Sequence, residues 1–302
     1  MHTIKGLVSI LVVTWNRKDA LARALDSAMQ QSYPQIEIVL IDNASTDGTE
    51  EFIRQRFPSV RYIRLDKNIG CPSGRNIGFG ECNGDFVYLL DDDGWLDPKA
   101  VEIDVTSAQA HPNAGVVMSK IVEIKEGVVK RVYPPELDVP AALSWFVGCC
   151  SLIRSSALAE VGLFPEDFFR QAEEEDLSLR MLDKGYYCWF EPTSIMYHDH
   201  SPVGRDQRLF AYYTLRNTTK TALRYYPAKW VVIRMVKNII HCIRYTIQLR
   251  MPGLPFSLLK DFCSDITRLK SERHPVSNST MSLYEELERQ PMLNIPQTNS
   301  NK

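Results

Sequence analysis

The sequence FVYLLDDDG at residues 86–94 decides the fold of this chain. Its first five residues form an apolar, β-rich run that predicts a short buried strand. Three carboxylates, Asp91, Asp92 and Asp93, follow this strand and would repel one another. A cation would relieve that repulsion, and hard oxygen ligands favour Mg²⁺ or Mn²⁺, which typically bridge carboxylates to phosphates. We therefore predict that Asp91 and Asp93 hold a metal; the alternative is an acidic turn.

The residues before this stretch alternate between strand and helix patterns. Apolar β-rich runs predict strands at 7–13, 36–41 and 60–65. Helical spacing predicts a helix at 19–31 and a second helix that ends at residue 57, with Thr46 or Asp47 as its cap. Residues 70–80 are rich in glycine, which predicts a loop with a short helix around 75–77.

This alternation implies a parallel sheet with helices on both faces. Ligands of such sheets bind at the carboxyl ends of the strands. Polar clusters follow four of the predicted strands, at 14–17, 42–47, 67–76 and 91–93. We expect these clusters to meet in space although they are far apart in sequence.

The second half of the chain predicts further strands and helices. Strand patterns occur at 114–124, 128–133, 145–153 and 188–197, where one or two short strands surround Pro192. Helix patterns occur at 99–110, 155–161, 173–184, 205–226 and 228–250. From residue 271 the composition turns to Ser, Asn, Pro, Gln and Thr, which predicts a mostly disordered tail over 271–302, with a helical turn at 283–289 as the alternative.

Composition limits the class of protein. The 302 residues are 44% hydrophobic and 24% charged, which suits one large domain or one domain with an appendage. Seven cysteines without a C-x-x-C pair favour a reducing compartment and argue against a zinc site or a disulfide framework. No secretory signal and no uninterrupted 18-residue apolar stretch is found, so we expect a cytoplasmic protein without a membrane-spanning helix.

Charge is distributed unevenly along the chain. Residues 1–206 carry a net charge of −11, whereas residues 207–260 carry ten basic and no acidic side chains. Arg234, Lys237, His241, Arg244 and Gln248 form one polar stripe on a strongly amphipathic helix. This helix either lies on an anionic membrane surface or packs on the body or in a homodimer interface. Nucleic acid is not expected as a partner, because no recognised module is present and the body is acidic.

Five blocks of this sequence resemble the inverting glycosyltransferases of family 2, which have the GT-A fold. They are VSILVVTWNR at 8–17, IVLIDNASTDGT at 38–49, NIGCPSGRNIG at 68–78, VYLLDDDGWLDP at 87–98 and EEEDLSLR at 173–180. Bacterial surface-polysaccharide enzymes, including rhamnosyltransferase-like members, look most similar. The resemblance implies an α/β fold with a mainly parallel sheet and flanking helices, divided into a nucleotide-binding Rossmann-like half and an acceptor half. The implied domains are a catalytic domain at 1–204, a basic helical extension at 205–270 and the tail at 271–302.

The resemblance also implies a nucleotide-sugar site at the predicted strand ends. Its implied residues are Thr14, Asn16, Arg17, Asp42, Asn43, Asp47, Asn68, Gly74, Arg75, Asn76, Asp91 and Asp92. Asp42 would contact the nucleotide base, and Arg75 would pair with the diphosphate unless it only makes local contacts in its loop. Asp91 to Asp93 match the metal-binding DXD element, and Asp93 is the expected direct ligand. His198 matches a metal-binding histidine after the last core strand, with His200 as its competitor.

An inverting transfer needs a base that removes the proton of the acceptor hydroxyl. The family places an Asp in a Glu-Asp-x-x-Leu-x-x-Arg pattern, and here Leu177 and Arg180 set the register so that Glu174 fills that position. Glu173 and Asp176 are alternates. The acidic residues could instead form a solvated helix start, which negative charge favours.

The resemblance thus implies a metal-dependent enzyme that moves a sugar from a nucleotide-diphosphate sugar to a hydroxyl of a glycan or lipid-linked acceptor in polysaccharide biosynthesis. We expect it in the cytoplasm or peripherally on the inner face of the cell membrane. Residues 148–151, with Trp145 nearby, match the region facing donor sugar and acceptor, although Trp145 fits a core position equally. The alternatives are a nucleotidyltransferase that makes nucleotide sugars and a non-catalytic scaffold on a lipid surface.

Overall fold

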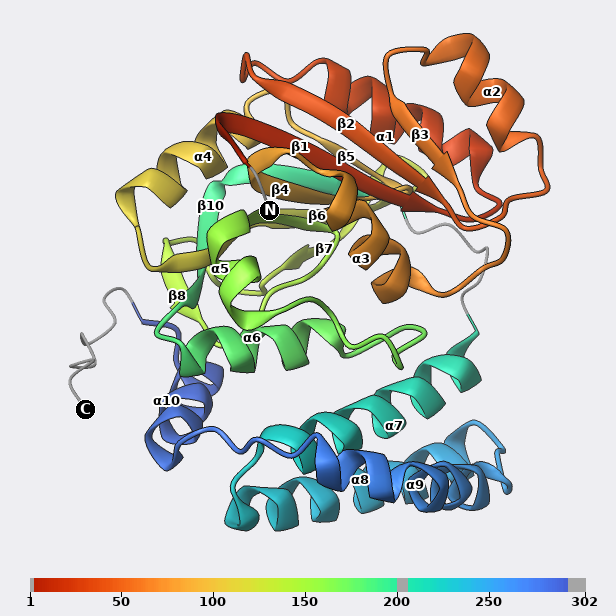
Figure 1. Cartoon of the computed structure of the whole chain (residues 1–302), viewed down its shortest axis with the longest axis vertical. Helices are drawn as coiled ribbons and strands as arrows, with labels where there is room; N and C mark the ends of the chain where they lie inside the picture. Colours follow the sequence, from red (N-terminus) through yellow and green to blue (C-terminus); the bar gives the residue numbers. More distant parts are fainter. Residues whose placement is uncertain (1–2, 200–205, 293–302) are drawn as a thin grey trace.

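The computed structural model describes residues 3–199 and 206–292 and contains one mixed ten-stranded sheet with helices on its faces (Figure 1). The first four strands are parallel in the order β3-β2-β1-β4. They are β1 (Ile4–Thr14), β2 (Ile36–Asp42), β3 (Arg61–Arg64) and β4 (Gly84–Asp91). Their register places Thr14 beside Asp42 and Val13 beside Asp91, so the predicted polar clusters meet at one edge of the sheet.

Helices α1 (Lys18–Met29), α2 (Thr49–Arg56) and α3 (Cys71–Glu81) connect these strands. The helices predicted at 19–31 and up to 57 are confirmed. The N-cap of α2 is Gly48 and not the predicted Thr46 or Asp47, although the Asp47 carboxylate accepts the Thr49 backbone N–H at 3.2 Å.

The glycine-rich loop predicted at 70–80 is wrong, because this segment is the eleven-residue helix α3. Gly74 and Gly78 face β1 and permit its close approach. A Cβ atom would lie 3.0 Å from Val13 Cγ1 at the first glycine and 2.3 Å from Leu11 Cδ1 at the second. These glycines therefore serve helix–strand packing and do not form a loop around a ligand.

The second half of the sheet mixes strand directions. Its strands are β5 (Gly94–Leu96), β6 (Ala114–Lys125), β7 (Val128–Tyr133), β8 (Ala141–Leu143), β9 (Cys150–Arg154) and β10 (Tyr187–His198). Strand β9 runs antiparallel to β4 and β6, β10 runs parallel to β6, and β5 runs antiparallel to β10. The last of these pairings sets His198 opposite Gly94 and brings it beside the three aspartates.

One strand prediction in this half needs correction, and the structure decides between the two alternatives left open around Pro192. The strand predicted at 145–153 begins only at Cys150, because the backbone of Gly148 binds the side chains of Arg75 and Glu174 instead of a neighbouring strand. The strand around Pro192 is continuous, with a register irregularity between Glu191 and Ile195.

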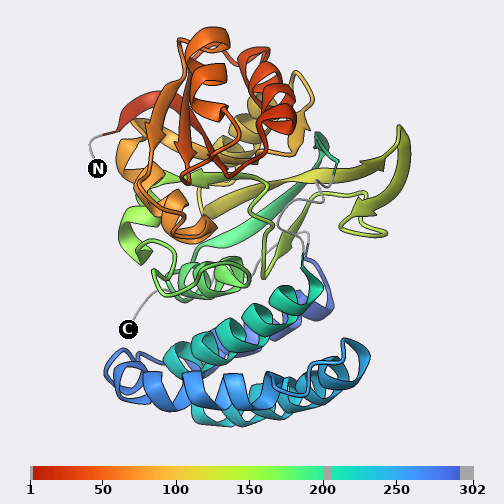
Figure 2. The same ribbon diagram turned by 90° about the vertical axis from the view of Figure 1, so that its right-hand side faces the viewer.

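Helices α4 (Ala100–Ala110), α5 (Ser155–Val161) and α6 (Glu173–Asp183) agree with the sequence predictions. The chain then continues as α7 (Gln207–Tyr225), α8 (Ala228–Gln248), α9 (Leu254–Ser271) and α10 (Asn278–Arg289). Figure 2 shows α7 between α6 and a lower layer formed by α8 and α9, and α7 contacts all three. Across the described residues, no helix combines the length and apolar character needed to cross a bilayer.

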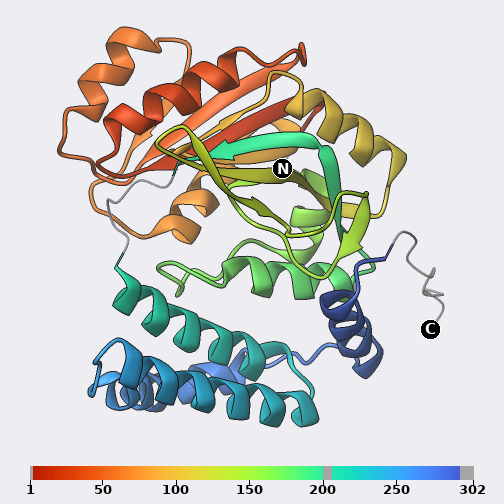
Figure 3. The ribbon, with the colours of Figure 1, turned by 180° about the vertical axis from the view of Figure 1, so that it is seen from behind.

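The disorder predicted from residue 271 is wrong for the part that the structure describes, whereas the helical turn predicted at 283–289 is confirmed as part of the longer α10. Helix α10 buries Met281, Tyr284 and Leu287, and it packs near α6 and β8 (Figure 3). Residue Met292 then pairs with Ala142 of β8. The remaining residues of the predicted tail, 293–302, lie outside the described residues.

Candidate active site

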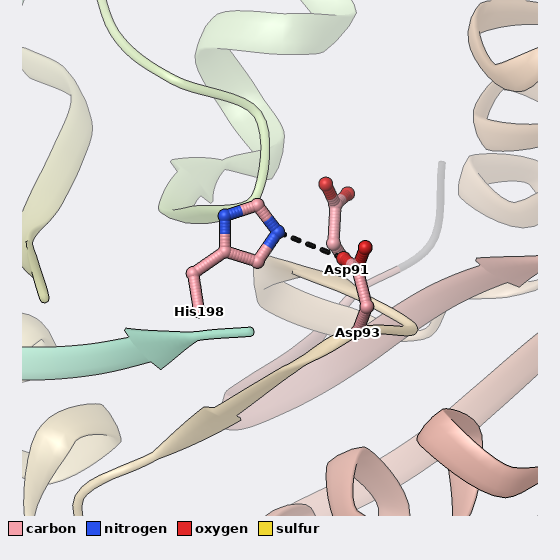
Figure 4. A group of neighbouring side chains, drawn as sticks. All are labelled: Asp91, Asp93 and His198. Atoms are coloured by element: carbon pink, nitrogen blue, oxygen red, sulfur yellow. Dashed lines mark hydrogen bonds and ion pairs between the residues drawn. The ribbon is translucent and has the colours of Figure 1, made fainter. Parts of the chain in front are cut away.

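Asp91, Asp93 and His198 form one cluster at the carboxyl edge of the sheet (Figure 4). One ligand atom from each lies within 4.8 Å of the other two, and His198 Nε2 is 2.8 Å from Asp93 Oδ1. Asp93 and His198 are buried, whereas Asp91 is partly exposed toward the cleft. Two carboxylates and one imidazole are a donor set that fits Mn²⁺ better than Mg²⁺. His200, the competing ligand, lies outside the described residues.

Asp92 turns away from this cluster. Its carboxylate accepts hydrogen bonds from Thr14 Oγ1 at 2.7 Å and from Arg17 Nη1 at 2.8 Å. Burial raises the pKa of Asp92 to about 6, and the nearby Arg17 guanidinium limits this rise. Asp92 therefore ties the ends of β1 and β4 together and orients Arg17, which also lies 3.3 Å from Asp93 Oδ2.

A cleft of about 1200 Å³ opens in front of the cluster. It is lined by many residues that the sequence predicted for the nucleotide-sugar site or as the base. These are Thr14, Arg17, Asn43, Asn68, Arg75, Asp91, Asp92, Glu173 and Glu174. The strand ends and the start of α6 thus bring together side chains that are up to 160 residues apart in sequence, as Thr14 and Glu174 are (174 − 14 = 160).

Asp42, which was predicted to contact the nucleotide base, does not line the cleft. Asp42 is fully buried, and its two oxygens accept hydrogen bonds from the Ser45 N–H and the Tyr62 hydroxyl. The structure therefore does not show the expected open face of Asp42 toward a nucleotide base. The reason is that Tyr62, from the adjacent strand β3, covers its outer oxygen.

Asn16, Asp47, Gly74 and Asn76 also do not line the cleft. The Asn16 side chain accepts the Thr46 N–H, and Asp47 accepts the Lys18 N–H, so both hold their loops in shape. Asn76 exchanges two hydrogen bonds with the backbone of Phe164. Its contribution is to anchor the segment that leads to α6.

Arg75 is buried and links the metal-site edge to helix α6. Its Nη2 atom donates to Asp91 Oδ1 at 3.0 Å and to the Gly148 carbonyl at 2.8 Å. Its Nη1 atom lies 3.3 Å from Glu173 Oε1 and 3.7 Å from Glu174 Oε1. The alternative of an Arg that makes only local contacts in a loop is therefore wrong.

Glu174 is the candidate base that faces the cleft. Its side chain is 22% exposed, and its Oε1 atom accepts the Gly148 backbone N–H at 3.2 Å. Burial raises the pKa of this carboxyl and Arg75 opposes the rise, so the carboxylate is a stronger base than an exposed glutamate while it stays paired with a cation.

Glu173 is more deeply buried than Glu174. Its Oε2 atom has no hydrogen-bond partner among the described residues. Burial, together with the neighbouring Glu174, raises the pKa of Glu173 to about 8. Burial therefore favours the neutral form of Glu173, while the more exposed Glu174 faces the cleft.

Asp176, the second alternate, lies on the buried side of α6. It is fully buried, and its oxygens accept hydrogen bonds from Arg180 Nε at 2.8 Å and from Thr221 Oγ1 at 3.2 Å. It does not line the cleft, so the structure contradicts its assignment as the base. Its position instead joins α6 to α7.

The sequence interpretation missed the residues that close the opposite side of the cleft. Arg131 and Tyr133 come from β7, whereas Phe169, Arg170 and Gln171 come from the segment before α6. Phe169, Arg170 and Gln171 directly precede the EEED block in the sequence, and this proximity could have identified them as cleft residues. Nothing comparable marks the first group, because β7 reaches the cleft only through its pairing with β6.

The Glu173→Gln variant is expected to melt at a higher temperature than the wild type at pH 8.5 but not at pH 4.5. Between these pH values the folded wild type keeps a proton that the unfolded chain has released, so its free energy of unfolding falls as pH rises. Glutamine resembles the neutral carboxyl and does not titrate. We expect a difference of about 2 °C, which roughly 1 kcal/mol produces in a chain of this size.

Calorimetric melting from pH 4.5 to 8.5 measures this difference. Glu166→Gln serves as the control, because Glu166 is exposed and lies near the same helix. Equal pH profiles for wild type and Glu173→Gln would show that Glu173 ionises normally.

The strand order and the flanking helices define an α/β protein with the GT-A architecture, and solved structures of this class share its shape. S. aureus TarS 1-349 in complex with UDP-GlcNAc superposes with a TM-score of 0.65 at 16% identity, over 88% of this chain and 84% of that one. The Pyrobaculum calidifontis mannosyltransferase PcManGT in complex with GDP-Man and Mn²⁺ gives a TM-score of 0.59 at 18% identity, over 95% and 85%.

The chain belongs to glycosyltransferase family 2, whose model matches residues 9–162. A similar curated protein is the N-acetylglucosaminyl-diphospho-decaprenol L-rhamnosyltransferase of Mycobacterium tuberculosis, with 24% identity over 66% of this chain and 78% of the relative. An uncharacterized glycosyltransferase of Rickettsia typhi is 27% identical over 76% and 72%. The protein is therefore a glycosyltransferase, as the five sequence blocks predicted.

Proposed function

We propose that this glycosyltransferase moves a sugar from a nucleoside diphosphate donor to a hydroxyl group in polysaccharide biosynthesis, with inversion at the anomeric carbon. The observation that carries this proposal is the placement of Glu174 in the cleft, joined through Arg75 to the Asp91 edge of the metal cluster. An inverting transfer needs a base and a site for the leaving diphosphate within one cleft. This arrangement supplies both.

The donor diphosphate would lie beside Asp91, Asp93 and His198, which would hold Mn²⁺ or Mg²⁺. A bound divalent cation supplies positive charge to the departing diphosphate. Arg75 keeps Asp91 in place through its 3.0 Å hydrogen bond. Arg17, held by Asp92, lines the cleft next to the same edge and adds a cation there.

Glu174 would take the proton of the acceptor hydroxyl as its oxygen attacks the anomeric carbon. The new carbon–oxygen bond forms on one face of the sugar while the bond to the diphosphate oxygen breaks on the other, which inverts the configuration. The Gly148 N–H orients the Glu174 carboxylate during this step. Burial raises the pKa of Glu173 and favours its neutral form, and Glu173 is less exposed to the cleft than Glu174.

The acceptor side of the cleft carries aromatic and basic groups. The rings of Tyr133 and Trp145 pack with their centroids 5.2 Å apart, and Arg131 stacks over Tyr133. Aromatic faces bind the apolar faces of sugars, and guanidinium groups bind phosphates. These groups suit a sugar linked through phosphate to a lipid, the kind of acceptor that the name of the mycobacterial relative describes.

Calorimetric titration with UDP, dTDP and GDP, each with and without Mn²⁺, tests this function. We expect one nucleotide to bind tightly and only in the presence of the metal, because the diphosphate and the acidic cluster repel each other without it. The same titration identifies the base of the donor. Absence of binding by all three to folded protein would favour the non-catalytic scaffold. Metal-dependent turnover of a nucleoside triphosphate with a sugar phosphate would favour the nucleotidyltransferase.

A further inference from the structure

Helices α8 and α9 expose a continuous apolar surface. Helix α8 has no buried residue, although more than half of its residues are apolar. We call this surface the apolar platform and define it by six side chains that are each more than half exposed. They are Val236, Ile240, Ile243 and Ile247 of α8 with Phe256 and Leu259 of α9.

The platform lies on the outer side of α8. The opposite side of the helix is held to the body, because Arg234 forms an ion pair with Glu175 and Asn238 donates hydrogen bonds to Thr218 and Thr219. Figure 2 shows α8 and α9 as the layer farthest from the sheet. An apolar groove of about 420 Å³ between α7, α8 and α9 continues the platform inward.

This outer layer is also basic. Several of the ten cations at 207–260 point inward, because Arg216 and Lys220 pair with Asp261 and Asp265 of α9 and Arg234 pairs with Glu175. The rim consists of the exposed cations around the platform. Lys237 and Arg244 are exposed on one flank of α8, and Arg250 and Lys260 are exposed near its end and on α9. The predicted polar stripe therefore exists, but Arg234 points to the body and the apolar side chains face outward.

Charge decides which partner fits this surface. A second copy docked face to face would bring two sets of cations together, which electrostatic repulsion disfavours. A planar anionic surface with an apolar interior offers negative groups to the cations of the rim and an apolar phase to the side chains of the platform. Amphipathic helices with basic flanks bind lipid bilayers in this way.

We propose that the apolar platform and its basic rim dock on an anionic lipid bilayer. The side chains of the platform enter the boundary between headgroups and acyl chains, and the cations of the rim lie among the headgroups. Helix α7 contributes Leu209 and Phe210 to the cleft and packs against both outer helices, so it couples the docked surface to the site. This docking goes beyond sugar transfer, because it needs neither donor nor acceptor.

Vesicle flotation of the full chain tests the proposal. We expect the wild type to float with vesicles that contain 30% phosphatidylglycerol in phosphatidylcholine, and at least tenfold less with phosphatidylcholine alone. The double variant Ile240→Glu/Ile243→Glu is expected to lose at least tenfold of the binding to anionic vesicles. Its matched control is Val128→Glu/Val129→Glu, which changes two equally exposed apolar residues on β7 and is expected to float like the wild type.

A second variant, Lys237→Glu/Arg244→Glu, changes two cations of the rim and leaves the platform side chains in place. It is expected to weaken binding only to the anionic vesicles. Nucleotide titration of every variant measures the donor site by itself. A variant that loses vesicle binding but still binds nucleotide then shows that the two functions are separate. The proposal is overturned if the wild type ignores anionic vesicles or if Ile240→Glu/Ile243→Glu binds them normally. It is also overturned if light scattering finds a wild-type dimer that this variant converts to a monomer, because the platform would then be a protein interface.

Discussion

Replacing Asp93 with Asn is expected to lower the rate of sugar transfer about a thousandfold and to abolish metal-dependent nucleotide binding. Asp93 is buried, and it contributes the most enclosed carboxylate of the predicted cation site. Asn has nearly the same size but no charge, so it is a much weaker ligand for a hard cation. Charge stabilisation by a divalent cation is worth several kcal/mol, and about 4 kcal/mol corresponds to a factor of roughly one thousand.

The measurement compares initial transfer rates and Mn²⁺-dependent nucleotide titrations for wild type and Asp93→Asn. Asp66→Asn is the matched control, because Asp66 is exposed and lies outside the cleft. Thermal melting of the variant is needed as well, since Asp93 also contacts His198 and Arg17. A folded Asp93→Asn protein that still binds nucleotide only with Mn²⁺ would exclude Asp93 as a ligand.

Replacing Glu174 with Gln is expected to lower the transfer rate between a hundredfold and ten thousandfold and to leave nucleotide binding intact. A positioned general base typically contributes roughly 10²–10⁴ to the rate. Glutamine keeps the shape of the side chain and can still accept the Gly148 N–H, but it cannot take a proton. The defect should therefore appear in kcat and not in the dissociation constant of the nucleotide.

Neighbouring variants show whether the defect belongs to this one carboxylate. Glu173→Gln should keep transfer within about tenfold of wild type, because burial raises the pKa of Glu173 and glutamine resembles its neutral form. Glu174→Asp keeps a carboxylate but places it about 1 Å short of its original position, so this variant should transfer sugar faster than Glu174→Gln and more slowly than wild type. A larger loss in Glu173→Gln than in Glu174→Gln would move the base to Glu173. Equal loss of nucleotide binding in Asp93→Asn and Glu174→Gln would contradict their separate roles.

The parallel half of the fold was predictable from local pattern. Strands β1 and β4 contain continuous apolar runs, β2 and the short β3 are rich in β-branched and aromatic residues, and polar residues follow each of the four. Parallel pairing then requires all four polar clusters to meet at one edge, as the structure confirms. The EEED block was equally visible, because it stands at the start of an amphipathic helix.

Predictions based on single residue types were less successful. Glycine frequency at 70–80 suggested a loop, but the glycines serve contact between α3 and β1. The polar composition after residue 271 suggested disorder, although Met281, Tyr284 and Leu287 recur at the spacing of one buried helix face. In both cases the deciding factor was the surface on which the segment packs, which composition does not reveal.

The sequence by itself determined the alternation of elements, the carboxylates at the end of β4 and the acidic start of α6. These depend on side-chain polarity and on periods of two or 3.6 residues, which are local properties. Only the tertiary structure decided that His198 reaches Asp93, that Arg75 is buried between Asp91 and the two glutamates, and that Glu174 and not Asp176 faces the cleft. It also decided that α8 turns its apolar side outward. These outcomes depend on strand register and on burial between segments distant in sequence, and a pattern along one segment cannot specify which distant surface it will meet.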